Sequence, residues 1–324
     1  MKIELVNKNS DNYSKLLAFV EKHNVFFSSM KWTSIYSSDN LHQCAILNNN
    51  NDVIGCFVYY SFKKSVFKFI ITPPYSPNID LFYVNPAVSI VGANSFNKDL
   101  IQLLVSYFES LKVPYININL PYDVIDTQPF IWEGFTSKVR YTYLINLSLE
   151  KEKLWDNLSS EKRKSVNKAI KDKVVVKETQ DYKLVYSLIL KSLERNDKNR
   201  NPEILENILF SFSNAKNSFA FVAYNNDVAI GATYCVFNKE KAIYLFGGFD
   251  SENKHHGAGV QCMWYSILKA RELNLKYFDF EGSMNANIER YFREFGGELK
   301  PYFCIEKIRP TLNSLLNLKG HKPF

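Results

Sequence analysis

The sequence predicts a mixed α+β fold in which two copies of one mixed-sheet domain follow each other along the chain. Residues 44–70 and 219–247 share one plan: strand, Asn-Asn-Asp turn, strand, charged turn and third strand. Two further pairs of segments match downstream at one constant offset, which is hard to obtain by chance. They are 111–120 with 273–282 and 130–135 with 292–297.

Each copy is expected to continue from its meander into an amphipathic helix, a buried strand, a short helix and a last strand. We place the first domain in residues 1–148, the second in 149–308 and a tail in 309–324. The segment VGANSFNKDL (91–100) is expected to precede the helix of the first copy. Apolar residues at helical spacing predict the two helices: Leu100, Leu103, Leu104, Tyr107, Phe108 and Leu111, then Val260, Met263, Trp264, Ile267 and Leu268.

The segment that joins the two copies is predicted to be helical. Ser159 or Ser160 can cap a helix that runs through EKRKSVNKAIKDK. Arg163 shares a helical face with Val166 and Asn167, so it is the basic residue that we expect to point inward. The alternative is an arginine whose stem only covers apolar surface.

Composition limits the class of protein. With 46% hydrophobic residues in 324, the chain can bury a real core. Its five cysteines show no C-x-x-C or zinc spacing, and we expect them to be reduced. No apolar run reaches the roughly 18 residues of a membrane span, and the start shows no signal peptide. We therefore expect a bacterial-type cytoplasmic protein without an integral membrane segment.

The net charge is uneven. Residues 1–148 carry 12 Lys and Arg against 11 Asp and Glu, so nearly all of the net charge of +7 lies beyond them. A lysine-rich run of this kind is usually a solvated helix face. An anionic partner such as a nucleotide, a coenzyme phosphate or tRNA is the alternative; nothing indicates DNA.

The two copies differ most where chemistry could be concentrated. Two asparagines of the first copy become Asp279 and Glu281, and an isoleucine becomes Arg293. We expect Asp279 and Glu281 to share one strand face and, with Arg293, to position an amine and stabilise negative charge on an acyl carbonyl. Alternatively, Asp279 caps the next segment and Arg293 pairs with Glu281 or Glu294.

The segment KHHGAG stands before the second amphipathic helix. Its glycines, Gly257 and Gly259, would let an anion approach the free N–H groups of the first helical turn, and Lys254 would add charge. Adjacent histidines lack the spacing of a helical metal site, so no metal is expected.

These residues resemble a known family. LSSEKRKSVNKAIK, FVAYNNDVAIGATYCV, GAGVQCMWYSILKARELNLKYFDFEG and NIERYFREFGG, in this order, are similar to the FemABX peptidyltransferase-like branch of the GNAT (Gcn-related N-acetyltransferase) superfamily. The resemblance reaches to about residue 308. It implies two tandem GNAT-like, that is acyl-CoA N-acyltransferase-like, domains.

The resemblance also implies roles for individual residues. Phe292 and Arg293 take the place of a Phe-Lys pair of the aminoacyl-transferring members, and Arg163 that of an acceptor-binding arginine. KHHGAG is similar to the coenzyme A pyrophosphate motif, with Lys254 first. Two departures stand out: Arg293 replaces a lysine, and Asn167 stands where the family has a tyrosine.

The leading hypothesis is an N-acyltransferase that acts on an amine acceptor, either a small molecule or a cell-wall precursor. The donor is acyl-CoA or aminoacyl-tRNA, and a catalytically silent ligand-binding module is the alternative. We expect Glu281 as base, with Arg293 and Asp279 beside it, and an acceptor site of Arg163, Asn167 and Phe292. The expected donor-phosphate residues are Lys254, Gly257, Ala258 and Gly259.

Overall fold

A computed structural model of the chain describes residues 1–195, 201–310 and 312. The chain divides into two compact units. Unit 1 consists of residues 1–140 and the described residues from Pro301 onward, and unit 2 consists of residues 141–300. Most of the expected tail, residues 311 and 313–324, lies outside the described residues.

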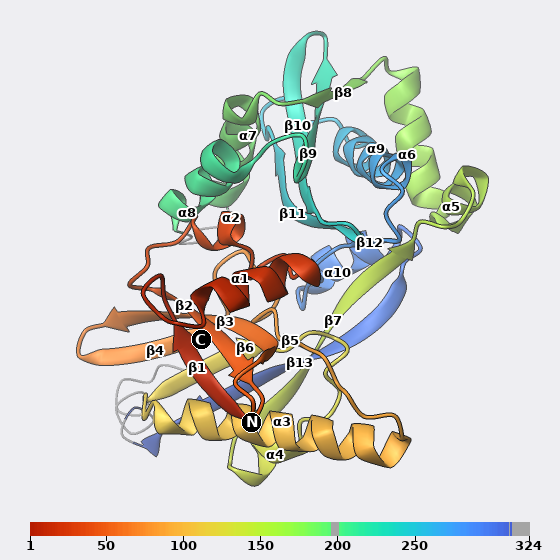
Figure 1. The fold of residues 1–324 in the computed structure, drawn as a ribbon. Helices are drawn as coiled ribbons and strands as arrows, with labels where there is room; N and C mark the ends of the chain where they lie inside the picture. Colours follow the sequence, from red (N-terminus) through yellow and green to blue (C-terminus); the bar gives the residue numbers. More distant parts are fainter. Residues whose placement is uncertain (196–200, 311, 313–324) are drawn as a thin grey trace. The chain divides into compact units, whose positions relative to one another are not determined.

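Unit 1 contains a mixed sheet with helices on both faces (Figure 1). Its strand order is β1-β2-β3-β4-β6-β13, in which β4 and β6 are parallel and the other neighbours antiparallel. The elements are β1 (Lys2–Val6), α1 (Tyr13–Lys22), α2 (Met30–Thr33), β2 (Leu41–Leu47), β3 (Val53–Lys64), β4 (Phe67–Ile71), β5 (Phe82–Tyr83), α3 (Ile90–Ser110), β6 (Tyr115–Asn119), α4 (Gln128–Trp132) and β13 (Glu298–Ile308).

The alternation of side chains along β2 explains why helices cover both faces of this sheet. Cys44 and Ile46 pack into the core that includes α3, whereas Ala45 and Leu47 pack into the core that includes α1. Because successive side chains of a strand point to opposite faces, a strand with four buried apolar residues in a row needs cover on both sides.

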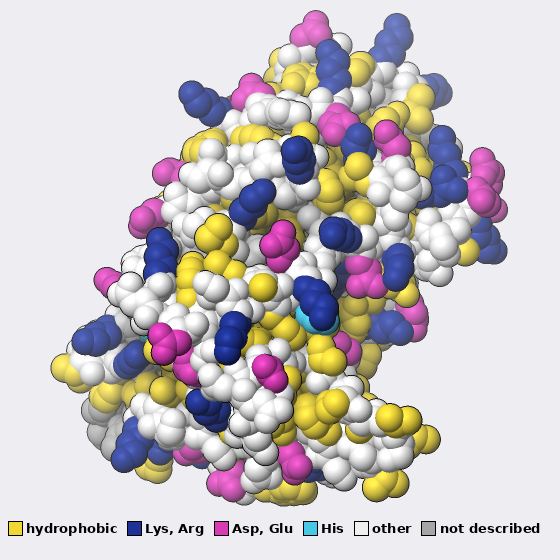
Figure 2. Space-filling view, viewed as in Figure 1, with side chains coloured by type: hydrophobic (Ala, Val, Ile, Leu, Met, Phe, Trp, Pro, Cys, Tyr) yellow, Lys and Arg dark blue, Asp and Glu magenta, His cyan; other side chains and the backbone are white. Residues whose placement is uncertain are grey.

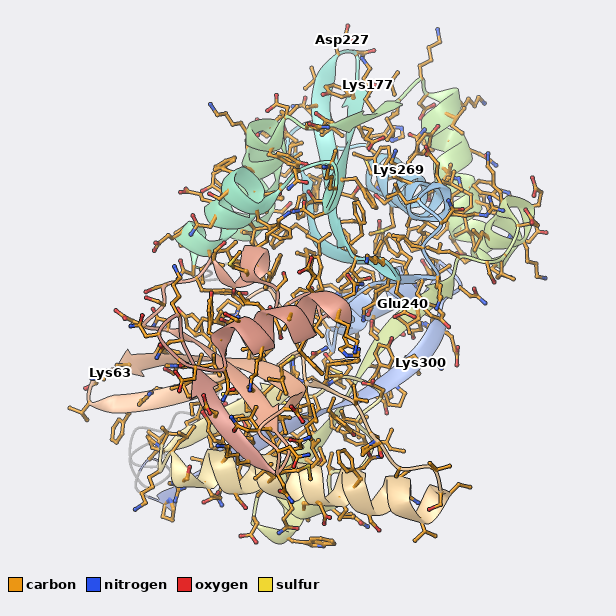
Figure 3. All side chains as sticks on the ribbon, viewed as in Figure 1. Lys63, Lys177, Asp227, Glu240, Lys269 and Lys300 are labelled. Carbon is orange, nitrogen blue, oxygen red and sulfur yellow. The ribbon has the colours of Figure 1, made fainter. Side chains whose placement is uncertain are left out.

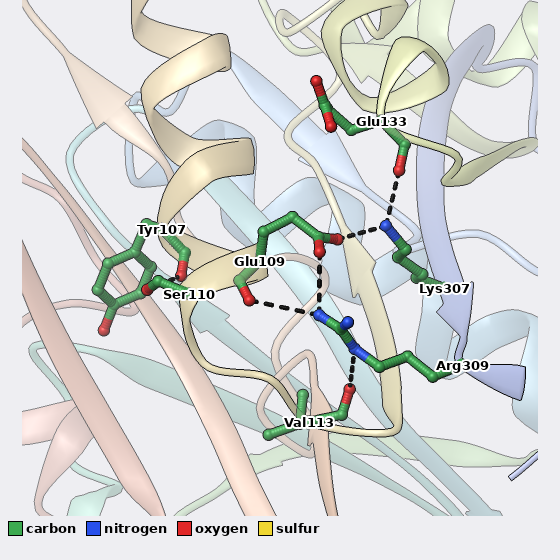
Figure 4. Close-up of polar contacts among 7 residues, drawn as sticks. All are labelled: Tyr107, Glu109, Ser110, Val113, Glu133, Lys307 and Arg309. Atoms are coloured by element: carbon green, nitrogen blue, oxygen red, sulfur yellow. Dashed lines mark hydrogen bonds and ion pairs between the residues drawn. The ribbon is translucent and has the colours of Figure 1, made fainter. Parts of the chain in front are cut away.

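The last strand, β13, is fastened to α3 by a cluster of charged groups (Figure 4). The Glu109 carboxylate accepts hydrogen bonds from Lys307 Nζ and, at 2.9 Å, from the guanidinium of Arg309. Arg309 Nε also donates to the carbonyl of Val113 at 3.0 Å, and Lys307 Nζ donates to the carbonyl of Glu133. One carboxylate shared by two cations therefore ties strand, helix and loop together.

Unit 2 repeats the plan with a mixed sheet of its own. Its strand order is β7-β12-β11-β10-β9-β8, with β11 and β12 parallel and the other neighbours antiparallel. Helix α7 covers one face, and α9 with α6 covers the other (Figure 1). The elements are β7 (Thr136–Asn146), α5 (Lys151–Asn157), α6 (Ser160–Lys171), β8 (Val175–Thr179), α7 (Tyr182–Arg195), α8 (Pro202–Glu206), a π-helical turn (Asn207–Phe212), β9 (Ser218–Asn225), β10 (Val228–Phe237), β11 (Lys241–Phe249), α9 (Ala258–Glu272), β12 (Tyr277–Asp279) and α10 (Ala286–Arg293).

The predicted meander of unit 2 is confirmed down to its turn. Asn226 and Asp227 both have positive φ, of 48° and 62°, and join β9 to β10. A two-residue loop with positive φ at both positions matches the twist of a hairpin, and Asn and Asp tolerate that conformation. Asp227 marks the tip of this hairpin (Figure 3).

The domain limits of the structure differ from those expected from the repeat. The division falls between Arg140 and Tyr141 and between Lys300 and Pro301. The last strands of the two copies are exchanged: Cys304 to Ile308 of β13 pair with β6 of unit 1, and Leu144 to Asn146 of β7 pair with β12 of unit 2. A repeat in sequence cannot reveal which copy a strand joins.

The segment VGANSFNKDL does not precede the first long helix but lies within it. Helix α3 begins at Ile90, where the Ser89 side chain accepts the N–H of Gly92 at 3.1 Å. This N-cap explains the early start, because it satisfies an N–H group that the first turn leaves unpaired.

Gly248 of β11 allows α7 to approach the sheet. A methyl group there would lie 2.4 Å from the carbonyl atoms of Leu188 and 2.5 Å from the nitrogen of Ile189. We expect Gly248→Ala to lower the free energy of unfolding by about 1–3 kcal/mol, because backbone must shift to admit the methyl. Urea unfolding measures this. Gly231→Ala on β10, whose nearest neighbour would be 3.6 Å away, is the matched control; equal effects of both changes would contradict the explanation.

Candidate functional site

Unit 2 contains a cavity of about 540 Å³ between β10, β11, the start of α9 and α10. Buried apolar residues form much of its wall: Ile230, Ala232, Ala258, Val260 and Phe292. Polar side chains also line it, among them Asp250, Lys254, His255, His256 and Asn287. A largely apolar cavity with a few polar groups is typical of a small-molecule site.

The cavity exists because β11 continues beyond its parallel neighbour. β11 pairs with β12 only from Lys241 to Ile243, and β12 ends at Asp279. On its other side β11 stays paired with β10 as far as Phe249. Residues 244–249 therefore have an edge that β12 does not cover, and Tyr244, Gly247 and Phe249 of this stretch line the cavity.

The first turn of α9 supplies hydrogen-bond donors beside this edge. The N–H of Gly257 donates to His255 Nδ1 at 3.1 Å, and that of Ala258 to the His255 carbonyl at 3.2 Å. Among the described residues, the N–H groups of Gly259 and Val260 have no acceptor. Two free N–H groups at the positive end of a 15-residue helix favour an anion.

The two glycines of this turn have different surroundings. A methyl on Gly259 would meet nothing within 4 Å, so its face is open toward a ligand. A methyl on Gly257 would lie 2.3 Å from the carbonyl oxygen of Ser165 and 2.8 Å from Cβ of Ala169, both on α6. Gly257 is therefore required for the packing of α9 against α6, and Gly259 provides the open approach.

His255 holds the loop in front of α9. Its Nε2 lies 3.0 Å from Oδ2 of Asp172, directly after α6, while its Nδ1 accepts the Gly257 N–H. Hydrogen bonding from Lys168 and His255 lowers the pKa of the Asp172 carboxyl. Both ring nitrogens of His255 are thus engaged, and the loop is fastened to α6.

A partly buried ion pair connects α6 to the end of α10. Lys162 Nζ lies 3.1 Å from Oε2 of Glu294 and 3.9 Å from the centre of the Tyr291 ring. Burial lowers the pKa of Lys162, and the Glu294 carboxylate opposes that shift. The hydroxyl of Tyr291 donates to the Gly259 carbonyl at 3.2 Å. This network positions the α10 wall of the cavity relative to the donor groups of α9.

The family model that matches the chain describes an acetyltransferase (GNAT) domain, and it covers residues 160–293. We refer to residues 160–293, the segment that this model matches, as the GNAT domain. The matched segment contains every cavity-lining residue of unit 2. A comparison with the curated proteins gives no match.

Solved structures extend the similarity over the whole chain. FemX is 15% identical, with 98% of this chain and 99% of FemX covered and a TM-score of 0.66. A tandem GNAT protein from the clavulanic acid biosynthesis pathway is 11% identical, with 94% and 97% covered and a TM-score of 0.55. L-PGS from Bacillus licheniformis is 8% identical, with 95% and 96% covered and a TM-score of 0.53. The predicted fold, two tandem GNAT-like domains, is confirmed.

Asp279 and Glu281 do not share a strand face in the GNAT domain, because β12 ends at Asp279 and Glu281 has a φ of 60°. The buried Asp279 accepts hydrogen bonds from the Thr142 hydroxyl at 2.7 Å and from the Glu281 N–H at 2.9 Å. Lys241 Nζ lies 3.5 Å from its other oxygen. Asp279 therefore fixes the turn after β12, close to the capping role weighed from sequence.

Arg293 is 60% exposed in its side chain and pairs with Glu289, one turn earlier on α10, at 3.1 Å. Glu289 also accepts the Tyr143 hydroxyl at 2.6 Å. Neither Arg293 nor Glu289 is among the cavity-lining residues, whereas the adjacent Phe292 is. The expected partners Glu281 and Glu294 are replaced by Glu289, because four residues is the spacing at which helical side chains meet.

Arg163 and Asn167 lie on α6, which begins after its N-cap Ser159, one of the two serines expected to cap it. The Arg163 guanidinium donates to the carbonyls of Asp156 and Leu158, both at 2.7 Å. It therefore satisfies carbonyls at the end of α5, while Asn167 is exposed. Neither residue lines the cavity of the GNAT domain.

The sequence comparison missed Tyr244 and Asp250, both of which line the cavity. Their signal was the length of the third meander strand. In unit 1 this strand ends at Ile71, shortly before Pro73 and Pro74, whereas β11 runs on to Phe249. Proline cannot donate to a strand ladder, so the difference was readable in the sequence.

Two further properties concern the described residues alone. They contain no group of three His, Cys, Asp or Glu side chains arranged to hold a metal ion. None of their helices combines the length and the apolarity needed to cross a membrane.

Asp250 gives the site a pH-dependent contribution to stability. Hydrogen bonding from Lys191, at 2.9 Å, and from the Glu252 N–H lowers its pKa to about 2. Since an unfolded aspartate has a pKa of about 3.9, the stabilisation is complete above that pH and disappears as pH falls toward 2.

We therefore expect the stability difference between the wild type and Asp250→Asn to shrink between pH 4 and pH 2. Urea unfolding midpoints across this range measure it, with Asp227→Asn at the hairpin tip as control. A difference that stays constant with pH would rule out the ionised Asp250–Lys191 pair as its source.

Proposed function

We propose that the chain is an N-acyltransferase whose GNAT domain holds a phosphate-bearing acyl donor, acyl-CoA, at the start of α9. The observation that supports it is the pair of free N–H groups on Gly259 and Val260, at the wall of a 540 Å³ cavity that Lys254 also lines. Ala258 follows the Gly257 N-cap and lies in the same turn. These groups fit a diphosphate, which helix N-termini and a lysine bind well.

The uncovered edge of β11 supports the same donor. An extended, amide-containing arm can lie along residues 244–249, where β12 no longer pairs. The apolar wall would then exclude water from the thioester, which strengthens electrostatic interactions with the reacting carbonyl. Coenzyme A would supply the activated thioester; the residues of this chain bind, orient and polarise it.

For the acceptor side we propose Glu281 as the group that positions or deprotonates the amine. Its carboxylate is close enough to contribute to the raised pKa of the cavity tyrosine Tyr244. Arg293 would not touch the substrate. Its guanidinium pairs with Glu289 outside the cavity, so it would influence the reaction only by positioning α10. A small-molecule amine or a cell-wall precursor, met in the cytoplasm, is the proposed acceptor class, with Arg163, Asn167 and Phe292 as the candidate contacts.

We expect coenzyme A to bind the wild type, and Lys254→Ala to weaken binding by about tenfold, the lower end for a charge-assisted hydrogen bond. Isothermal calorimetry measures both affinities. Lys239→Ala, an exposed lysine in the turn between β10 and β11, is the matched control and should leave the affinity unchanged. No binding to the wild type at millimolar coenzyme A would reject this donor.

Aminoacyl-tRNA is the second candidate donor. The likeness to FemX over the whole chain favours it, as do five exposed lysines on α5 and α6 of unit 2: Lys151, Lys153, Lys164, Lys168 and Lys171. Dark blue side chains lie over these helices in Figure 2, together with magenta side chains of acidic residues.

If tRNA is the donor, its affinity should fall steeply with salt, because binding releases counterions from many phosphates. Replacing both Lys164 and Lys171 by alanine should then weaken binding and reduce the slope of log affinity against log salt by about one for each lost phosphate contact. Fluorescence anisotropy with labelled tRNA measures this, again with Lys239→Ala as control. A slope near zero would exclude tRNA.

A catalytically silent ligand-binding member of the fold is the remaining alternative. A panel of primary amines incubated with acetyl-CoA and followed by mass spectrometry separates it from an enzyme. A mass increase of one acetyl group on any amine identifies a transferase.

A further inference from the structure

The cavity of the GNAT domain contains four side-chain hydroxyl groups, and three have partners. Ser192 accepts the N–H of Phe249 at 2.9 Å, Thr233 shares a hydrogen bond with Ser266 at 2.8 Å, and Tyr291 donates to the Gly259 carbonyl. For the fourth, Tyr244, the described structure contains no hydrogen-bond partner. A half-buried phenol without a partner in a cavity has a donor available for a ligand.

Neighbouring residues fix the position of the Tyr244 side chain. Tyr244 is the first residue of β11 beyond the last pair with β12, so it stands where the edge opens. Its ring packs edge-on against Phe292, with centroids 5.8 Å apart. Its hydroxyl lies over Gly247, where a methyl group would come within 2.0 Å of the oxygen. Gly247 has an ordinary negative or extended φ, so space for the hydroxyl is its structural contribution.

We propose that the hydroxyl of Tyr244 donates a hydrogen bond to the carbonyl oxygen of the donor's thioester and stabilises the oxyanion formed when the amine attacks. The inference rests on the proposed function, because it takes the donor to lie between the start of α9 and the edge of β11. It assigns to Tyr244 the contact with the reacting carbonyl.

The reaction then runs in two balanced steps. The amine lone pair forms the C–N bond while the carbonyl π pair moves onto oxygen, where Tyr244 donates its hydrogen bond. On collapse the C=O bond re-forms, the C–S bond breaks and sulfur leaves with its electron pair. The surplus proton of the attached amine passes to the thiolate through solvent or Glu281. Tyr244 keeps its proton throughout.

Acidity decides between donating a hydrogen bond and transferring the proton. Burial, with smaller contributions from neighbouring groups that include Glu281, raises the pKa of Tyr244 above its ordinary value of about 10. A thiol has a pKa of about 8.5, so proton transfer from this phenol to the thiolate would be uphill. A neutral phenol in an apolar wall is suited to stabilise an oxyanion by hydrogen bonding.

Infrared difference spectroscopy of bound acetyl-CoA carrying ¹³C at the carbonyl tests the contact without an acceptor. We expect a lower carbonyl frequency in the wild type than in Tyr244→Phe, because a hydrogen bond weakens the C=O bond. Where an amine is acetylated, turnover should fall by about 10²-fold in this variant, with coenzyme A affinity retained. Tyr265→Phe, on α9 and outside the cavity lining, is the matched control.

Gly247→Ala provides a second route to the same result. The methyl would displace the hydroxyl and should remove the frequency shift while leaving the fold intact. In the Tyr244→Phe background it should add little, because the oxygen it would meet is gone; such non-additivity indicates that the two residues act together. Equal carbonyl frequencies in wild type and Tyr244→Phe, both with bound coenzyme, would overturn this inference alone. Failure of the wild type to bind acetyl-CoA would reject acyl-CoA as the donor in the proposed function, and this inference with it.

Discussion

The departure of β11 from β12 after Ile243 is the constraint on which the site depends. Three residue pairs hold the two parallel strands together, and β11 then continues for six residues against β10 alone. If β12 had continued, its backbone and side chains would occupy the cavity edge. Because β12 stops at Asp279, whose side chain binds the N–H of Glu281, the turn that ends one strand also opens the space beside the other.

The other wall depends on how closely helices pack. Gly257 brings the start of α9 against Ser165 and Ala169 of α6, and the Lys162–Glu294 pair ties α6 to α10. The Lys162 end of this pair is buried, so removing Glu294 would leave a poorly solvated charge, and the pair resists separation of the two elements. The first turn of α9 and the apolar face of α10 are thus held against a common support, which keeps the free N–H groups of α9 and the cavity wall in a fixed relation.

The internal repeat was sufficient to predict the mixed α+β class, the meanders and the helix that contains Val260 to Leu268. The capping pattern offered Ser159 or Ser160 as the N-cap, and the structure shows Ser159. The repeat could not predict every side chain of the site, because it compares residue types at matched positions and not the three-dimensional surroundings of those residues. Asp279 and Arg293 were singled out as charges gained by the second copy, yet local geometry engages them with Thr142 and Glu289. Tyr244 attracted no notice because a tyrosine in a β-rich strand is ordinary. Only the end of β12 makes it a cavity residue.

In the proposed reaction, proton acceptance and stabilisation of negative charge fall to two different groups, the Glu281 carboxylate and the Tyr244 phenol. Catalytic acids and bases are commonly assigned from neighbouring ionisable groups whose surroundings move their pKa values apart. A carboxylate, Glu281, lies close enough to Tyr244 to help keep the phenol protonated. In the proposed reaction, Glu281 is the group that can accept a proton from the amine, and the phenol is the group that can stabilise negative charge without giving one up. An arginine in the position of Tyr244 would need a counter-ion in an apolar wall; a neutral phenol stabilises the oxyanion without introducing a buried charge.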